Sequence, residues 1–81
     1  RSRLGKELYE AYPANVSFKN GLAVSYAKLG VFCRDNLKEK DKARAYFQQA
    51  EGLWQALVAD APLYVEFRNN LEWVQNVLKG L

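Results

Sequence analysis

The stretch Val-Ser-Phe-Lys-Asn-Gly-Leu at residues 16–22 returns in altered form as Val-Glu-Phe-Arg-Asn-Asn-Leu at residues 65–71. Each copy begins three residues after a proline, and the two prolines, Pro13 and Pro62, stand 49 positions apart. Internal repetition with a period of roughly 20 to 50 residues is typical of stacked repeat proteins, in which each unit buries its apolar face against its neighbours. The repetition therefore favours a binding surface over a catalytic pocket.

The composition is that of one small folded domain. The chain has 81 residues, of which 49% are hydrophobic and 14% aromatic. Its core is modest, because a domain of this size buries only about 60% of its unfolded surface. The formal net charge of +3 is spread along the sequence, whereas a nucleic-acid-binding surface needs clustered basic residues. We therefore expect neither a nucleic-acid nor a membrane partner, since the sequence also has no run of about 18 apolar residues.

Residue types that build catalytic and metal sites are scarce. The chain has no histidine and one cysteine, Cys33, so a Cys/His zinc site and a Cys/His nucleophile pair are both excluded. The acidic residues lie outside the apolar stripes that would desolvate a carboxylate and raise its pKa. We expect no enzymatic activity, no metal and no cofactor. Cys33 is interpreted as a small buried core residue, and a lone cysteine favours a reducing compartment such as the cytoplasm.

Helical spacing of the apolar residues predicts four helices and no strand. The predicted helices cover residues 4–12, about 14–34, 41–61 and 62–80. The prolines end the first and third helices, because the residue before a proline disfavours the helical conformation. The polar stretch at residues 35–41 predicts the turn between the second and third helices, with Asp41 as a candidate N-cap.

Each predicted helix carries an apolar stripe that we expect to face the core. On the second helix the stripe is Phe18, Leu22, Tyr26, Leu29 and Cys33. On the third it is Ala43, Phe47, Ala50, Trp54, Leu57 and Ala61, widened by Tyr46, Leu53 and Val58. On the last it is Phe67, Leu71, Val74 and Leu78. The wide third stripe predicts neighbours on two sides, and small residues at 23, 30, 43 and 50 predict a close approach of the second and third helices.

The run Asn-Gly-Leu-Ala-Val-Ser-Tyr-Ala-Lys-Leu-Gly at residues 20–30 resembles the first helix of tetratricopeptide repeats, in the long-period bacterial variety with units of about 50 residues. Residues 42–50 match the small and aromatic positions of the second helix, and Pro62 matches the proline that ends the unit. The resemblance implies antiparallel helix-turn-helix units in a right-handed αα superhelix. It divides the chain into the end of one repeat (1–12), a full repeat (13–61) and the first helix of a following or capping repeat (62–81).

The resemblance also implies a function as a non-catalytic scaffold or sensor that binds a peptide or helix of a partner protein on a concave surface. Trp73 and its repeat mate Val24 are the expected apolar anchors, and neighbouring polar residues would set the orientation of the ligand. The expected partner-binding residues are Asn20, Val24, Ala27, Val31, Arg34, Asn69, Trp73 and Asn76. One departure from the family is the turn at residues 38–41, which lacks the usual glycine.

Several alternatives stay open at this level. The apolar strip could pack against a neighbouring repeat or a second copy, and self-association is expected if a stack is cut at its ends. The asparagines could simply be solvated. Phe18 and Phe67 could form a nucleic-acid stacking surface, but their spacing favours the core. At the level of function, the alternatives are a structural or oligomerisation segment of a larger signalling protein or enzyme, and a helical nucleic-acid-binding module.

Overall fold

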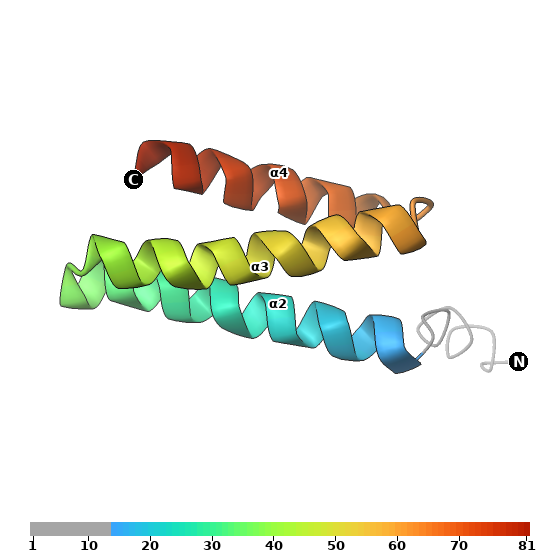
Figure 1. Ribbon diagram of the computed structural model, residues 1–81, viewed down its shortest axis with the longest axis horizontal. Coiled ribbons are helices and arrows are strands. Elements are labelled where there is room, and N and C mark those ends of the chain that lie inside the picture. Colours follow the sequence, from blue (N-terminus) through green and yellow to red (C-terminus); the bar gives the residue numbers. More distant parts are fainter. Residues whose placement is uncertain (1–13) are drawn as a thin grey trace, which may run out of the picture.

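A computed structural model describes residues 14–81, which contain three helices and no strand. Helix α2 spans Ala14–Phe32 and continues into a π-helical turn at Cys33–Leu37; α3 spans Lys40–Asp60 and α4 spans Val65–Gly80. Helices α2 and α4 run in the same direction, and α3 lies between them and runs antiparallel to both (Figure 1). The all-α prediction is confirmed for these residues, and the helix predicted at residues 4–12 lies outside them.

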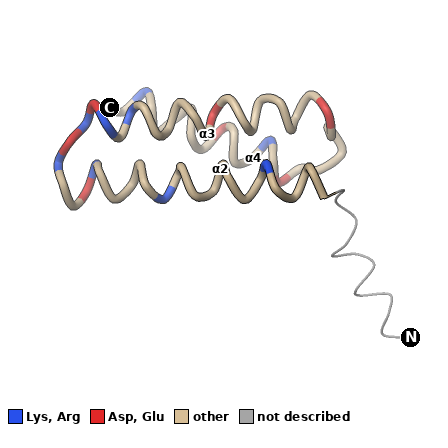
Figure 2. The backbone as a smooth tube through the Cα atoms, turned by 60° about the horizontal axis from the view of Figure 1, so that its bottom comes forward, with Lys and Arg blue, Asp and Glu red and all other residues tan. Residues whose placement is uncertain are grey.

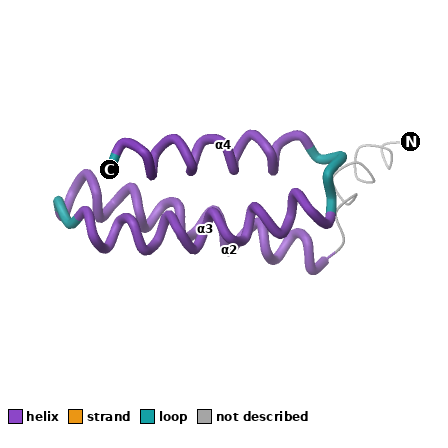
Figure 3. The backbone as a smooth tube through the Cα atoms, turned by 45° about the horizontal axis from the view of Figure 1, so that its top comes forward, coloured by secondary structure: helices purple, strands orange, loops and turns teal. Residues whose placement is uncertain are grey.

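The link between α2 and α3 is shorter than predicted (Figure 3). Because the chain continues as a π-helical turn to Leu37, only Lys38 and Glu39 separate the two helices. Lys38 adopts a left-handed conformation with φ 58° and ψ 35°, and the Glu39 backbone N–H donates to the Cys33 carbonyl at 2.9 Å. The prediction of Asp41 as N-cap is wrong, because Asp41 lies inside the first turn of α3.

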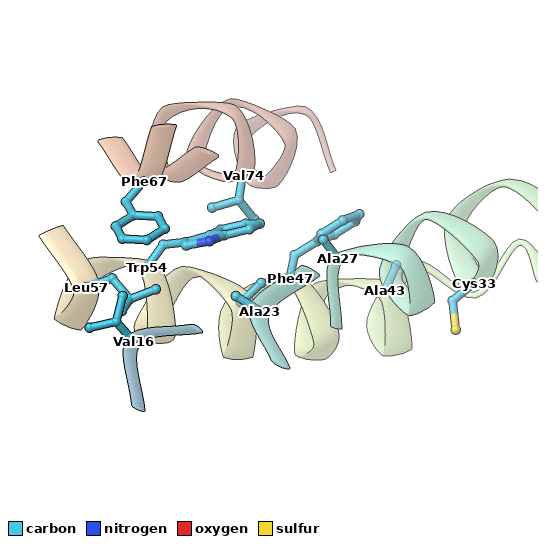
Figure 4. Packing of buried hydrophobic residues seen from close by; sticks show 11 residues of the cluster. Val16, Ala23, Ala27, Cys33, Ala43, Phe47, Trp54, Leu57, Phe67 and Val74 are labelled. Atoms are coloured by element: carbon cyan, nitrogen blue, oxygen red, sulfur yellow. The ribbon is translucent and has the colours of Figure 1, made fainter. Parts of the chain in front are cut away.

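Helix α3 supplies most of the core. Its buried residues are Ala43, Phe47, Ala50, Trp54 and Leu57, as the sequence predicts. Phe47 and Trp54 project toward α2 and α4 from the middle of this row (Figure 4). The partly buried residues Tyr46, Leu53 and Val58 pack against the same cluster. The expectation that α3 has neighbours on two sides is thus confirmed.

The close approach of α2 and α3 is also confirmed. Ala23 on α2 and Ala43 and Ala50 on α3 are completely buried. At Gly30 a Cβ atom would lie 2.8 Å from a carbon of the Phe47 ring. This separation is too short for a side chain, so the absence of one at Gly30 lets the Phe47 ring lie against the α2 backbone.

The predicted core stripe of α2 is wrong at Phe18 and Leu29, whereas Tyr26 packs against the core as predicted. Phe18 is 68% exposed and Leu29 is 44% exposed, whereas the buried residues of α2 are Val16, Ala23, Ala27 and Gly30. The cause is that α2 carries apolar residues on several sides, so periodicity alone does not select one face. The small-residue face is buried because it admits the Phe47 ring. Cys33 is buried, as expected.

The corresponding stripe on α4 is confirmed. Phe67 and Val74 are completely buried, and Leu71 and Leu78 pack against the core. The Tyr64 ring meets the Phe67 ring edge-on with 5.6 Å between centroids. The two phenylalanines of the repeat, Phe18 and Phe67, therefore have opposite environments despite their equivalent places in the sequence.

Candidate functional site

An apolar groove of about 320 Å³ lies between α2 and α4, over the middle of α3. Helix α2 contributes one wall and α4 the other, and Trp54 of α3, only 2% exposed, forms the floor. The residues that line it are Val24, Ala27, Lys28, Val31, Trp54, Asn70 and Trp73. The groove exists because both outer helices pack on the same central helix and leave a channel between their side chains.

Helical periodicity explains why these side chains meet. Val24, Lys28 and Val31 are separated by four and three residues, so they form one strip along α2. Asn70 and Trp73 are three residues apart and form the facing strip of α4. Trp73 stands 49 residues after Val24, so two repeat-equivalent residues face each other across the groove.

Trp73 is the largest partly exposed side chain in the groove. Its ring meets the Phe47 ring edge-on, with 5.9 Å between centroids and 76° between planes, a favoured aromatic geometry. It nevertheless remains 42% exposed. Trp73 is therefore held in place by the core on one side and available for contact on the other.

The structure brings together four of the eight expected partner-binding residues, Val24, Ala27, Val31 and Trp73. The other four do not line the groove. Asn69 and Asn76 are exposed on α4. Asn20 is not a solvated asparagine, because its Oδ1 accepts a hydrogen bond from Trp54 Nε1 at 3.0 Å.

Arg34 is engaged within the chain, beyond the groove lining. Its Nε donates to Asp35 Oδ1 at 2.8 Å and its Nη2 donates to Asp35 Oδ2 at 3.1 Å. Its guanidinium also lies 6.0 Å from the centroid of the Phe47 ring, at the outer limit of a cation–π contact. The hydrogen bond from Arg34 lowers the pKa of Asp35, and the same bond raises the pKa of Arg34.

Three of the residues that line the groove were not predicted from the sequence as binding residues. Lys28 lies one turn after Val24 in the same strip, and Asn70 lies one turn before Trp73, so helical spacing could have found both. Trp54 was assigned to the core, where it does lie, but its position at the floor of the groove depends on how α2 and α4 pack on α3. No local sequence pattern predicts how α2 and α4 pack on α3.

The groove offers binding contacts of two kinds. Val24, Ala27, Val31 and the two tryptophans present apolar surface, while Asn70 and Lys28 present an amide and an ammonium group. Within residues 14–81 no three His, Cys, Asp or Glu side chains lie close enough to hold a metal ion. Over the same range no helix is both long and apolar enough to cross a membrane. The arrangement suits an apolar ligand segment that also carries an acceptor for Lys28.

A scan against protein-family models and searches of curated proteins and of solved structures found no match to this chain.

Proposed function

We propose that this chain is a tetratricopeptide-like, non-catalytic module that binds a peptide or helix of a partner protein in the groove between α2 and α4. The observation that carries the proposal is the pair of repeat-equivalent anchors, Val24 and Trp73, which face one apolar channel from two parallel helices. The signature at residues 20–30 and the antiparallel pairing of α2 with α3 support it.

The lining also restricts the chemistry of the partner. Helix α2 carries two charged residues, Lys19 and Lys28, and no acidic one (Figure 2). Lys28 is the one charged residue among the described groove residues. A ligand that places an apolar side chain beside Trp73 and a carboxylate near Lys28 would match both features. We therefore propose an amphipathic segment with an acidic flank as the ligand.

The test uses peptides selected against the whole chain. A phage-displayed library of helix-forming peptides of about 16 residues is panned on the protein, and affinities are measured by tryptophan fluorescence. Because Trp54 and Trp73 both line the groove, a bound peptide should shift their emission to shorter wavelength. Trp73→Ala should weaken binding by about 2 kcal/mol or more, as loss of a buried aromatic anchor does.

The matched control is Asn76→Ala, an exposed position on the same helix outside the groove, which should leave affinity unchanged. Peptides that bind Trp73→Ala and the parent chain equally would place the binding surface elsewhere. A loss of several kcal/mol of folding stability in Trp73→Ala, without a specific loss of binding, would make Trp73 a core residue and refute the groove.

A second candidate function is a structural or oligomerisation segment of a larger signalling protein or enzyme. Within residues 14–81 the apolar residues Phe18, Leu29 and Phe32 of α2 are exposed, which favours it, because monomeric proteins rarely leave a large apolar patch uncovered. The two candidates use different faces of α2, so substitutions on each face distinguish them.

A further inference from the structure

The two polar side chains of the groove lie on opposite sides of its apolar anchors, Val24 and Trp73. Lys28 follows Val24 by four residues on α2, and Asn70 precedes Trp73 by three residues on α4. Because α2 and α4 run in the same direction (Figure 1), Lys28 lies toward the C-terminal ends of the two walls and Asn70 toward their N-terminal ends. The helical rise puts about 10 Å of groove between these two positions. Side chains of both walls lean toward the N-terminus, so their order along the groove is kept.

Lys28 is available to bind a charged group of the ligand. It is exposed, and among residues 14–81 it forms no ion pair. Every other described residue that lines the groove is uncharged. The end of the groove at Lys28 therefore attracts a carboxylate, whereas the end at Asn70 offers an amide that both donates and accepts hydrogen bonds.

Between these ends the groove suits one large apolar side chain. Its volume of about 320 Å³ is near the lower limit of ligand pockets, about 300–1,000 Å³. The Trp54 Nε1–H at the floor already donates to Asn20 Oδ1 at 3.0 Å, so the floor offers its ring and no free donor. A polar tip on the ligand side chain would lose its hydrogen bonds to water without replacement. The anchor of the ligand is therefore wholly apolar.

The helix dipoles favour one direction for a helical ligand. Helices α2 and α4 both have their C-terminal ends beyond Lys28, and α3 beneath them has its N-terminal end there (Figure 1). Two negative helix ends and one positive end leave a net negative potential, which favours the positive N-terminus of a ligand helix. Such a ligand lies antiparallel to both walls. An acidic residue in its first turn is stabilised by its own helix dipole and by Lys28.

We infer, on the basis of the proposed function, that the partner segment is a helix whose acidic residue precedes its apolar anchor by one turn, three or four residues. The anchor packs between Val24 and Trp73, and the carboxylate meets Lys28, which lies one turn beyond Val24. The residue one turn after the anchor lies beside Asn70. The groove thus selects the order of residues in its ligand as well as their chemical types.

Peptides that differ only in this order test the inference on the complete 81-residue chain. Helix-forming peptides of about 16 residues are selected from two phage-displayed libraries, one with Glu fixed four positions before Leu and one with the reverse order. The best peptides, and versions with Glu and Leu exchanged, are synthesised with acetylated and amidated ends, so that no terminal carboxylate contributes. Affinities are measured by tryptophan fluorescence. The Glu-first version of each peptide should bind about fivefold more tightly, because it combines the Lys28 contact with the favourable dipole.

Charge reversal identifies the residue responsible for the preference. Lys28→Glu should weaken the Glu-first peptide about tenfold and strengthen a version with Lys in place of that Glu. Lys19→Glu is the matched control, since Lys19 has the same charge on the same helix and does not line the groove. It should change neither affinity by more than about twofold. If Lys28→Glu loses helix content in circular dichroism, Lys28→Gln supplies the test and should remove most of the preference for the Glu-first order.

The outcomes separate failure of the inference from failure of the proposed function. Equal affinities for the two orders, with both peptides weakened by Trp73→Ala, would overturn the inference and leave the groove as the binding site. Tighter binding of the Leu-first peptides would also overturn it and would place the ligand parallel to the walls. Peptides that are unaffected by Trp73→Ala, or the absence of binders from both libraries, would refute the proposed function and the inference with it.

Discussion

At the scale of single residues, one hydrogen bond distinguishes Asn20 from Asn69, although the two asparagines occupy equivalent positions in the repeat. Asn20 and Asn69 are repeat mates, yet Asn20 accepts a hydrogen bond from Trp54 Nε1 across the α2–α3 interface, whereas Asn69 is exposed. The Trp54 side chain is almost fully buried, so its N–H depends on that acceptor. Asn20 is thus part of the structure that holds the floor of the groove.

We predict that Asn20→Ala lowers the free energy of unfolding by about 1–2 kcal/mol, because it leaves the Trp54 N–H without its acceptor. Urea denaturation followed by tryptophan fluorescence measures the loss. Asn69→Ala is the matched control and should change stability by less than about 0.5 kcal/mol, as an exposed substitution does. Equal effects of the two substitutions would contradict the role assigned to the hydrogen bond.

Two glycines of α2 offer a second contrast at this scale. A Cβ atom at Gly30 would lie 2.8 Å from the Phe47 ring, whereas one at Gly21 would meet nothing within 4 Å. We predict that Gly30→Ala lowers the free energy of unfolding by about 1–3 kcal/mol through overpacking. Gly21→Ala should raise it by about 0.5–1 kcal/mol, since alanine is the better helix former. Stabilisation by Gly30→Ala would mean that the helices are not in this close contact.

At the scale of elements, the turn between α2 and α3 contains an unfavourable backbone conformation. Lys38 has a φ of 58°, where a side chain is strained and where glycine is the usual residue at a helix C-terminus. The turn is closed all the same by the hydrogen bond from the Glu39 N–H to the Cys33 carbonyl. The turn therefore has Lys38 at the position where a glycine would relieve the backbone strain.

We predict that Lys38→Gly raises the free energy of unfolding by up to about 1 kcal/mol. The substitution removes the strain of the left-handed conformation, and the larger backbone entropy that glycine loses on folding offsets part of this gain. The comparison is Lys42→Gly inside α3, which should lower stability by about 1 kcal/mol. Thermal unfolding of both variants tests the pair. Destabilisation by both would show that Lys38 is not left-handed in solution.

At the scale of the three-helix arrangement of residues 14–81, Phe47 connects α2, α3 and α4. Its ring lies against the backbone of α2 at Gly30 and meets Trp73 of α4, and it is completely buried in α3. Domains of this size are stable by roughly 4–12 kcal/mol, from about 0.05–0.15 kcal/mol per residue. One buried aromatic residue is therefore a large part of the total.

We predict that Phe47→Ala lowers the free energy of unfolding by about 3–5 kcal/mol and broadens or abolishes the cooperative transition. The loss should appear in near-ultraviolet circular dichroism and in hydrogen exchange of both α2 and α4, because both helices lose the same neighbour. Gln48→Ala, the exposed residue beside it, is the control and should be neutral. Loosening confined to one outer helix would contradict the shared role of Phe47.

Local sequence signals were enough to predict the helices within residues 14–81 and the central position of α3. Helical spacing and Pro62 are local signals, and α3 is apolar on one broad stripe, so its buried residues were predictable one by one. The shared position of Val24 and Trp73 along one groove was also predicted, because the 49-residue repeat marks them as equivalent. Periodicity is enough to predict the buried residues of a helix that has a single apolar stripe.

Packing between the helices, and no local pattern, selects the buried face of α2 and the residues that complete the groove. Because α2 has apolar residues on more than one side, the choice between Phe18 and the face of Ala23 and Gly30 depends on the shape of the neighbour, here the Phe47 ring. The difference between Asn20 and Asn69 and the place of Trp54 beneath the groove have the same origin. These are contacts between elements distant in the chain, which no local pattern encodes.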